Sequence, residues 1–270
     1  MTGTGPLSDP AVRQAISAGI DRTALSVKGE TGYELPATSS SALILPNQAA
    51  YLTPSLKNDL SAHSDPAKVA SILTADGYAK DANGFYAKNG TEIKFSIEDP
   101  TAYSDYYADC QLISNELQAE GIDATVDGVQ ASQWYSDSAS GNFQSIIHWG
   151  NGGSSPYVQY QNWLDYTQSA PIGSSANSDY GRYDSPAAQA DLTKLATTNP
   201  ANKAALMAAT VALENLVSTQ VPVAPLLYGA DWDEYSTAHF TGFVTPQNPY
   251  ADPSPGDPQL PLILKHLKKV

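Results

Sequence analysis

Residues 93–126 combine two patterns of apolar and polar positions. Residues 93–97 and 122–126 alternate apolar with polar side chains, which is typical of half-buried strands. Between them, residues 102–120 place apolar side chains on one helical face, and Gly121 is expected to end the helix. Strand, helix and strand in this order predict a βαβ unit with parallel strands and a right-handed crossover. The apolar positions are Ile93, Phe95, Ile97, Tyr106, Cys110, Ile113, Leu117, Ile122, Ala124 and Val126.

Four helices are predicted from a side-chain acceptor followed by proline. The acceptor caps the free N–H groups of the first turn, and proline fits the first helical position because its nitrogen carries no hydrogen. The helix after Asp65 should end at Gly77, and the helix after Asn199 carries an apolar stripe that reaches Val217. The four pairs are Asp9-Pro10, Asp65-Pro66, Ser185-Pro186 and Asn199-Pro200.

The remaining patterns predict a further strand, an extended segment and two loops, and together with the βαβ unit they predict an α/β fold class. Residues 143–149 (FQSIIHW) are more continuously apolar, which predicts a buried central strand. Residues 221–228 read as extended but contain two prolines, which places them at an edge or a crossing point. Residues 150–163 and 168–185 are expected to be long loops, and long loops inside compact domains are usually functional or mobile.

Composition narrows the classes of function. The 270 residues carry 14 Lys+Arg and 28 Asp+Glu, a net charge of −14, which disfavours binding to nucleic acid or to an anionic membrane. The single cysteine, Cys110, excludes an internal disulfide and a cysteine-based zinc site, and its place on an apolar helical face predicts a buried structural thiol. No apolar run is long enough for a transmembrane helix. The N-terminus has no signal-peptide pattern, so we expect a cytosolic protein or a piece of a larger one.

No catalytic, metal-binding or cofactor-binding motif is found in the sequence. It has no G-x-S-x-G elbow, no phosphate-binding glycine loop and no EF-hand, and its four histidines lack metal-ligand spacing. Asp231, Asp233 and Glu234 cluster, but such a cluster is typical of a solvated face. A pair of carboxylates for glycoside hydrolysis stays possible because that chemistry depends on a spatial separation.

Aromatic and amide side chains gather around the end of the strand predicted at residues 143–149. Ligands of open α/β sheets bind at the carboxyl ends of strands, and rings beside uncharged donors and acceptors suit a hydroxyl- or amide-rich molecule. The alternative is that these rings only cover the end of the sheet. The candidate ligand-binding residues are Trp134, Trp149, Asn151, Tyr157, Gln159, Tyr160, Asn162 and Trp163.

Six segments of the sequence together form a specific pattern, although each segment alone is only a weak indication of a protein family. They are residues 6–25 (PLSDPAVRQAISAGIDRTAL), 65–78 (DPAKVASILTADGY), 81–94, 112–123 (LISNELQAEGID), 171–183 (PIGSSANSDYGRY) and 221–227. Together they resemble the family 5 extracytoplasmic solute-binding proteins of ABC importers, which bind dipeptides, oligopeptides, nickel or oligosaccharides.

The resemblance implies one lobe of a two-lobed protein. Family members are about twice this length, and their lobes close on a ligand. We therefore expect a periplasmic-binding-protein-like lobe with a mixed sheet flanked by helices. Residues 1–220 would form the second ligand-binding lobe, and residues 221–270 an extended segment returning towards the missing first lobe. The resemblance also implies a periplasmic protein or cell-surface lipoprotein that delivers its solute to a membrane permease, without a cofactor.

Two features favour an oligosaccharide over an oligopeptide. Peptide-binding members that hold a free amino terminus typically carry an acidic residue before a proline here, whereas this chain has Ser154-Ser155-Pro156. An ammonium group would then lose its ion-pair partner in a closed site. Residues 241–251 (TGFVTPQNPYA) also resemble the ending of members associated with saccharides.

Three hypotheses therefore remain for the function. The first is a solute-binding protein in which Trp149 and Trp163 stack on the solute while Asn151, Gln159 and Asn162 donate and accept hydrogen bonds. The second is an extracellular carbohydrate-active enzyme, with carboxylates such as Asp165, Asp179 or Asp184 near the same loop. The third is a receptor of the same fold for peptides or metal chelates.

Overall fold

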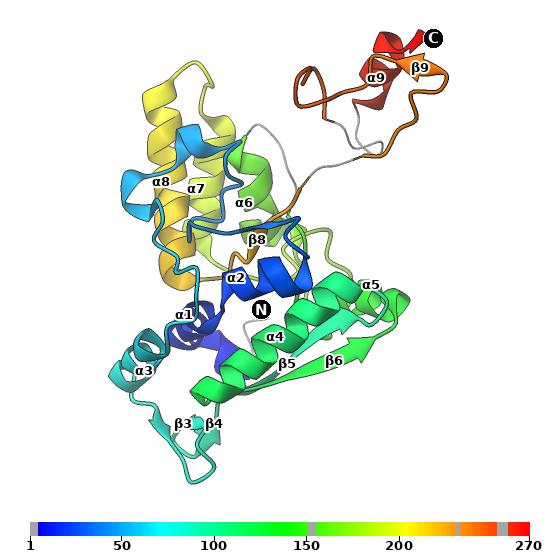
Figure 1. Cartoon of the computed structure of the whole chain (residues 1–270). Helices are drawn as coiled ribbons and strands as arrows, with labels where there is room; N and C mark the ends of the chain where they lie inside the picture. The colour runs from blue at the N-terminus through cyan, green and yellow to red at the C-terminus, as the bar shows by residue number, and fades with distance from the viewer. Residues whose placement is uncertain (1–4, 151–154, 231–232, 253–258) are drawn as a thin grey trace. The chain divides into compact units, whose positions relative to one another are not determined.

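The computed structural model describes residues 5–150, 155–230, 233–252 and 259–270. The chain divides into two compact units, Met1–Tyr228 and Gly229–Val270 (Figure 1). The first unit contains a three-stranded parallel sheet with helices packed on it, so the α/β fold class is confirmed. Among the described residues, no helix has both the length and the apolar character that a bilayer span requires.

The βαβ unit predicted for residues 93–126 is confirmed. Strand β5 (Lys94–Pro100) and strand β6 (Asp123–Val129) pair in parallel over seven residues, and helix α4 (Ser104–Glu120) connects them (Figure 1). Gly121 adopts φ 99° at the C-cap of α4, as its left-handed tolerance predicts. Helix α4 packs on one face of both strands and covers that face of the sheet.

The strand predicted at residues 143–149 is shorter than expected and lies at an edge. Strand β7 (Ser145–Ile146) pairs with β5, and the order is β6-β5-β7, so β5 is the central strand. The backbone N–H of Ser96 donates to Oε1 of Gln144 at 2.7 Å, and Ser145 Oγ donates to the carbonyl of Ser96 at 2.9 Å. Side chains therefore occupy backbone groups of Ser96 next to the ladder, which is consistent with the short pairing.

The main hydrophobic core lies between α4, β5 and the N-terminal helices. Helix α1 (Pro10–Gly19) is capped by Asp9 and helix α3 (Pro66–Ala75) by Asp65, each with proline at the first position. Cys110 is fully buried in this core, which confirms the predicted structural thiol. Other core side chains are Val12, Ile16, Val69, Leu73, Phe95, Ile97, Ile113 and Leu117.

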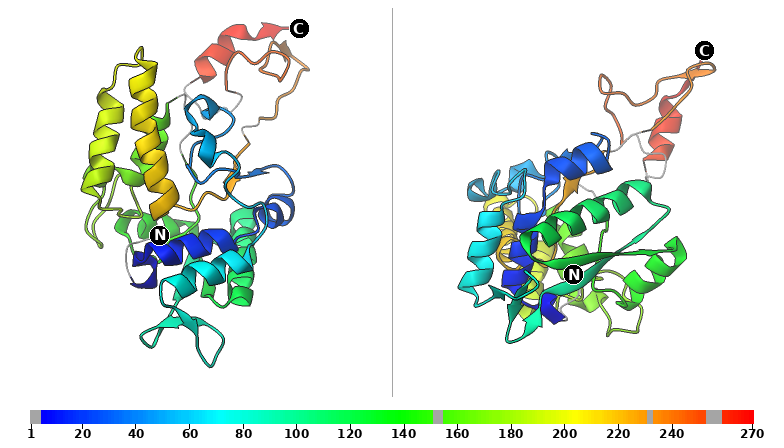
Figure 2. Two further views of the ribbon diagram at one scale, coloured as in Figure 1. Left: turned by 90° about the vertical axis from the view of Figure 1, so that its left-hand side faces the viewer. Right: turned by 60° about the horizontal axis from the view of Figure 1, so that its bottom comes forward.

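A second core joins α6 (Pro156–Leu164), α7 (Pro186–Thr197) and α8 (Lys203–Gln220). Helices α7 and α8 lie side by side (Figures 1 and 2). Ser185 caps α7 as predicted, but α8 begins three residues later than expected. Its cap is Asn202, whose Oδ1 accepts from the N–H of Ala205 at 3.1 Å, whereas Asn199 caps only a preceding turn.

Helix α6 was not expected, since residues 150–163 were predicted to be a loop. Ser155 is the N-cap, its Oγ accepts from the N–H of Tyr157 at 3.3 Å, and Pro156 takes the first helical position. The serine–proline pair is the same signal that predicted α7 at Ser185. The prediction was wrong because the aromatic and amide composition was given more weight than the cap.

Two buried arginines, Arg13 on α1 and Arg22 in the short helix α2 (Arg22–Ala24), bind the end of α8 and the segment after it. Arg13 donates from Nε and Nη2 to the carbonyl of Gln220, at 2.9 and 2.6 Å, and from Nη1 to the carbonyl of Leu7 at 2.8 Å. Arg22 donates from Nε to the carbonyl of Pro225 at 2.8 Å. Burial lowers the pKa of Arg22 to about 10. These bonds hold residues 220–225 in place although the two prolines there limit ladder pairing.

The smaller elements complete the two units. In the first, Leu227–Tyr228 (β8) pairs with β1 in a two-stranded sheet, so only the end of residues 221–228 forms a strand, and both prolines lie before it. The other elements of this unit are α2 (Arg22–Ala24), β1 (Leu35–Pro36), β2 (Ala79–Lys80), β3 (Tyr86–Lys88), β4 (Thr91–Glu92), α5 (Ala131–Ser140) and the short turns Gly5–Ser8, Leu25–Gly29, Ala49–Tyr51, Pro54–Leu56 and Tyr166–Gln168. The second unit holds β9 (Phe240–Thr241), α9 (Leu260–His266) and β10 (Lys268–Lys269), with β9 antiparallel to β10.

Two buried carboxyl groups meet where α4 packs on the turn Leu25–Gly29. Burial and, to a smaller extent, the nearby Glu30 and Glu34 raise the pKa of Asp109 to about 8. Burial likewise raises the pKa of Glu30 to about 7, and the side chain of Asp109 is its hydrogen-bond partner. A Cβ at Gly29 would collide with the Asp109 carboxyl, so the close approach requires glycine. These contacts favour a protonated Asp109 in the folded state.

The stability of the chain should therefore fall as the pH rises. Because the folded-state pKa of Asp109 is raised above its unfolded value of about 3.8, its contribution is fully present below that value and is lost as the pH climbs to about 8. In urea titrations between pH 5 and 8, each such group should lower the free energy of unfolding by up to about 1.4 kcal/mol per pH unit. Asp109→Asn should reduce this slope, and Asp184→Asn, at an exposed position, should leave it unchanged. An equal slope in wild type and Asp109→Asn would contradict the assignment.

Candidate functional site

Aromatic rings gather just beyond the carboxyl end of β7. The strand ends at Ile146, and His148 and Trp149 follow it. Helix α5 brings Trp134, whose ring stacks on that of Trp149 with centroids 5.3 Å apart and an interplanar angle of 29°. Tyr135 approaches Trp149 edge-on at 6.5 Å. The aromatic platform, as we use the term, comprises Trp134, Tyr135, His148, Trp149, Trp163 and Tyr180.

The two stacked tryptophans differ in exposure. Trp134 is 1% exposed and Trp149 is 41% exposed, so Trp134 supports Trp149 from the buried side. Tyr135, at 51%, is exposed beside them, and its hydroxyl lies 3.3 Å from that of Tyr103. The indole nitrogens of Trp134 and Trp163 are buried and have no hydrogen-bond partner among the described residues. The platform therefore offers an exposed indole and a phenol for contact with a solute.

His148 links the rings of the platform and was missed by sequence reasoning. Its ring stacks with Trp134 at 5.0 Å and lies 4.6 Å from Trp149. Burial lowers the pKa of His148, which favours the neutral imidazole. The histidines were tested in the sequence only for metal-ligand spacing. The available signal was the position of His148 at the end of an apolar run, directly before Trp149.

The candidate residues on α6 have different surroundings. Tyr160 is buried and donates its hydroxyl proton to the carbonyl of Ser41 at 3.0 Å. Gln159 is also buried, and its Nε2 donates to the carbonyl of Ala42 at 3.0 Å. Both side chains therefore fasten α6 to residues 41–42. Tyr157 is half-buried against the second core.

The other candidate residues are split between the platform and its borders. Trp163 meets His148 edge-on at 6.0 Å, so the structure brings it together with Trp134 and Trp149. Asn162 is half-buried, and its carbonyl accepts from the N–H of Asp179 at 2.7 Å. Asn151 lies outside the described residues.

Arg182 organises the predicted loop at residues 168–185 and places Tyr180. Its guanidinium donates to four backbone carbonyls: Ala139 at 2.8 Å, Ala170 at 3.0 Å, Ser174 at 3.3 Å and Tyr180 at 2.7 Å. Ala139 lies on α5, so this loop is bonded to the helix that carries Trp134. The ring of Tyr180 then lies 5.2 Å from that of His148.

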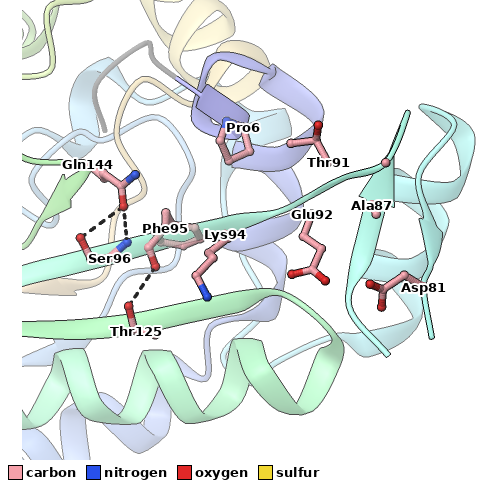
Figure 3. Close-up of a pocket in the computed structure, with 11 residues that line it drawn as sticks. Pro6, Asp81, Ala87, Thr91, Glu92, Lys94, Phe95, Ser96, Thr125 and Gln144 are labelled. Atoms are coloured by element: carbon pink, nitrogen blue, oxygen red, sulfur yellow. Dashed lines mark hydrogen bonds between the residues drawn. The ribbon is translucent and has the colours of Figure 1, made fainter. Parts of the chain in front are cut away.

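A cavity of about 670 Å³ lies at the opposite end of the sheet, near the start of β5 (Figure 3). Three of its polar side chains already have partners: Oε1 of Gln144 accepts from both N and Oγ of Ser96, and Lys94 pairs with Asp123 at 2.6 Å. We therefore favour the aromatic platform as the ligand site. Among the described residues, no three His, Cys, Asp or Glu side chains are grouped so as to hold a metal ion.

The α/β fold, a parallel sheet flanked by helices, is of the periplasmic-binding-protein type. Residues 2–171 match the sequence profile described as "Bacterial extracellular solute-binding proteins, family 5 Middle". The chain belongs to this family. Comparison with curated proteins gives no match.

Solved structures share the fold. A periplasmic oligopeptide-binding protein of Thermotoga maritima, crystallised with mannohexaose bound, is 22% identical, with a TM-score of 0.84 over 99% of this chain and 50% of that one. AppA of Bacillus subtilis, an oligopeptide-binding protein in complex with a nonapeptide, is 15% identical, with a TM-score of 0.65 over 84% and 43%. NikZ of Campylobacter jejuni, in complex with Ni(L-His), is 18% identical, with a TM-score of 0.68 over 82% and 42%. The chain thus spans about half the length of these proteins, and at these identities the likeness shows the fold alone.

Removing the Arg182 guanidinium should loosen the loop it holds. Because four carbonyls would lose a charged donor, we expect Arg182→Ala to cost on the order of 2 kcal/mol. Hydrogen exchange should rise at least tenfold at the amides of Gly173 and Ala176, which bond to α5. Lys203→Ala, at an exposed position, is the control and should leave both rates unchanged. Unaltered exchange in Arg182→Ala would show that the loop is held by other contacts.

Proposed function

We propose that this chain is one ligand-binding lobe of an extracytoplasmic solute-binding protein that delivers a neutral oligosaccharide to an ABC permease. The observation that carries the proposal is the exposed indole of Trp149, backed by the buried ring of Trp134 at 5.3 Å. A rigid aromatic face suits the flat apolar face of a pyranose ring, and the exposed phenol of the neighbouring Tyr135 suits its hydroxyls.

The charge around the platform supports a neutral solute over a peptide with a free amino terminus. Ser155, the N-cap of α6, stands directly before Pro156, where peptide-binding members of the family typically carry an acidic residue. Glu98, opposite Ile146 in the ladder, is buried, and burial raises its pKa to about 7. The Glu98 side chain is only 4% exposed, so it offers little surface to an ammonium group of a solute.

The enzyme hypothesis finds little support in two of the three carboxylates it invoked, Asp165 and Asp179. Asp179 is buried, and its Oδ1 accepts from the N–H of Tyr183 at 3.0 Å. Asp165 is buried too, and its Oδ1 accepts from the N–H of Thr167 at 3.1 Å. Both carboxylates serve as turn caps, so we propose a binding protein without catalytic residues.

The full-length protein would contain a second lobe. We propose that residues 1–220 belong to the lobe that carries the platform and that residues 221–270 extend towards the other lobe. A ligand drives closure only through its greater affinity for the closed state, so binding to the isolated chain should be weaker than to the two-lobed protein. We also propose a periplasmic location or anchoring as a cell-surface lipoprotein.

The role of Trp149 can be tested by titration of the two-lobed protein with mannohexaose in a calorimeter. Because a stacked ring contributes about 1.5 kcal/mol, Trp149→Ala should weaken binding roughly tenfold. Tyr166→Ala, which removes an exposed ring from the turn Tyr166–Gln168, is the matched control and should retain wild-type affinity.

Parallel titrations of the two-lobed protein with a nonapeptide and with Ni(L-His) test whether it is instead a receptor for peptides or metal chelates. Binding of either, with no binding of mannohexaose, would replace the proposed solute class. Unchanged mannohexaose affinity in Trp149→Ala would remove Trp149 from the site.

A further inference from the structure

His148 contacts rings that come from four separate parts of the sequence. Trp134 comes from α5, Trp163 from α6, Tyr180 from the loop at 168–185, and Trp149 is the adjacent residue. The centroid distances are 5.0, 6.0, 5.2 and 4.6 Å in that order. Within the platform, the rings of Tyr180 and Trp163 contact the ring of His148, whereas Trp149 also stacks directly on Trp134.

A hydrogen bond joins the same imidazole to the backbone of Trp149. His148 Nδ1 lies 2.8 Å from the carbonyl oxygen of Trp149. Because a carbonyl oxygen only accepts, the imidazole must carry its proton on Nδ1. The bond closes a small ring between the side chain of one residue and the carbonyl of the next, so it restrains the backbone that carries the exposed indole.

We propose that His148 is the positioning residue of the platform: its Nδ1–H and its ring together hold Trp149 in the stacked orientation on Trp134. The ligand part of this inference rests on the proposed function. A ring fixed before binding loses little conformational entropy when a solute stacks on it, and such preorganisation raises affinity. His148 would thus set the affinity for the solute without touching it.

Two variants separate the functions of the ring and the N–H group. His148→Phe keeps an aromatic ring but removes the donor, whereas His148→Asn keeps a short N–H donor but removes the ring. The readout is the exciton couplet in the far-ultraviolet circular dichroism spectrum, which two closely stacked indoles produce when their transition dipoles couple. Trp149→Ala defines the signal without the pair. His63→Phe, at an exposed histidine, is the control and should retain the full couplet.

Both His148 variants should lose at least half of the Trp134–Trp149 couplet, and mannohexaose affinity in the two-lobed protein should fall about fivefold. A wild-type couplet in either folded variant overturns the proposal, even if its melting temperature is lower. Absence of mannohexaose binding in the wild type would refute the proposed function, whereas the couplet is measured without any ligand.

A measurement on the wild-type protein covers the case in which the variants do not fold. The ¹⁵N chemical shifts of the His148 imidazole distinguish a protonated from an unprotonated nitrogen. The proposal requires a proton on Nδ1 at neutral pH. A resonance pattern with the proton on Nε2 alone overturns it.

Discussion

The parallel pairing of β5 with β6 and β7 is the constraint on which the site depends. Parallel strands must be joined by crossovers, so the segments that follow them all leave from one end of the sheet. Helix α5 follows β6, and His148 and Trp149 follow β7. Rings from distant parts of the sequence therefore meet at that end, while α4 covers one face of the sheet and buries its apolar side chains. Among the described residues, the cavity at the other end of the sheet has a single aromatic side chain, Phe95, in its lining.

Backbone carbonyls, more than opposite charges, hold the irregular segments in place. Arg13 and Arg22 fasten the segment that follows α8, and Arg182 fastens the loop behind the platform. A guanidinium can donate to several carbonyls at once, which suits backbone that makes no ladder or helix bonds. The chain has a net charge of −14, and these arginines bind backbone carbonyls instead of carboxylates. Buried carboxyls such as Asp109 are therefore stabilised by protonation. The same chain is thus expected to lose stability towards alkaline pH.

Sequence rules for strands, helix caps and helix ends gave correct predictions where the whole pattern lies within a few consecutive residues. The alternating strands, the helix stop at Gly121 and the caps at Asp9, Asp65 and Ser185 could all be read directly. The same rule would have predicted α6 from Ser155-Pro156 had composition not been given more weight. The cap of α8 was misplaced by three residues because Asn199 and Asn202 are both good caps, and only the second leads into the packed helix.

By itself, the sequence determined the α/β class, the βαβ unit, the burial of Cys110 and the resemblance to solute-binding proteins. Those properties depend on the spacing of apolar, capping and motif residues along the chain, which the sequence gives directly. Only the tertiary structure decided which aromatic residues meet. It stacked Trp134 under Trp149, placed His148 among four rings and turned Tyr160 towards Ser41. These contacts join residues far apart in the chain, so no local period encodes them. They follow from how the strands pair and the helices pack.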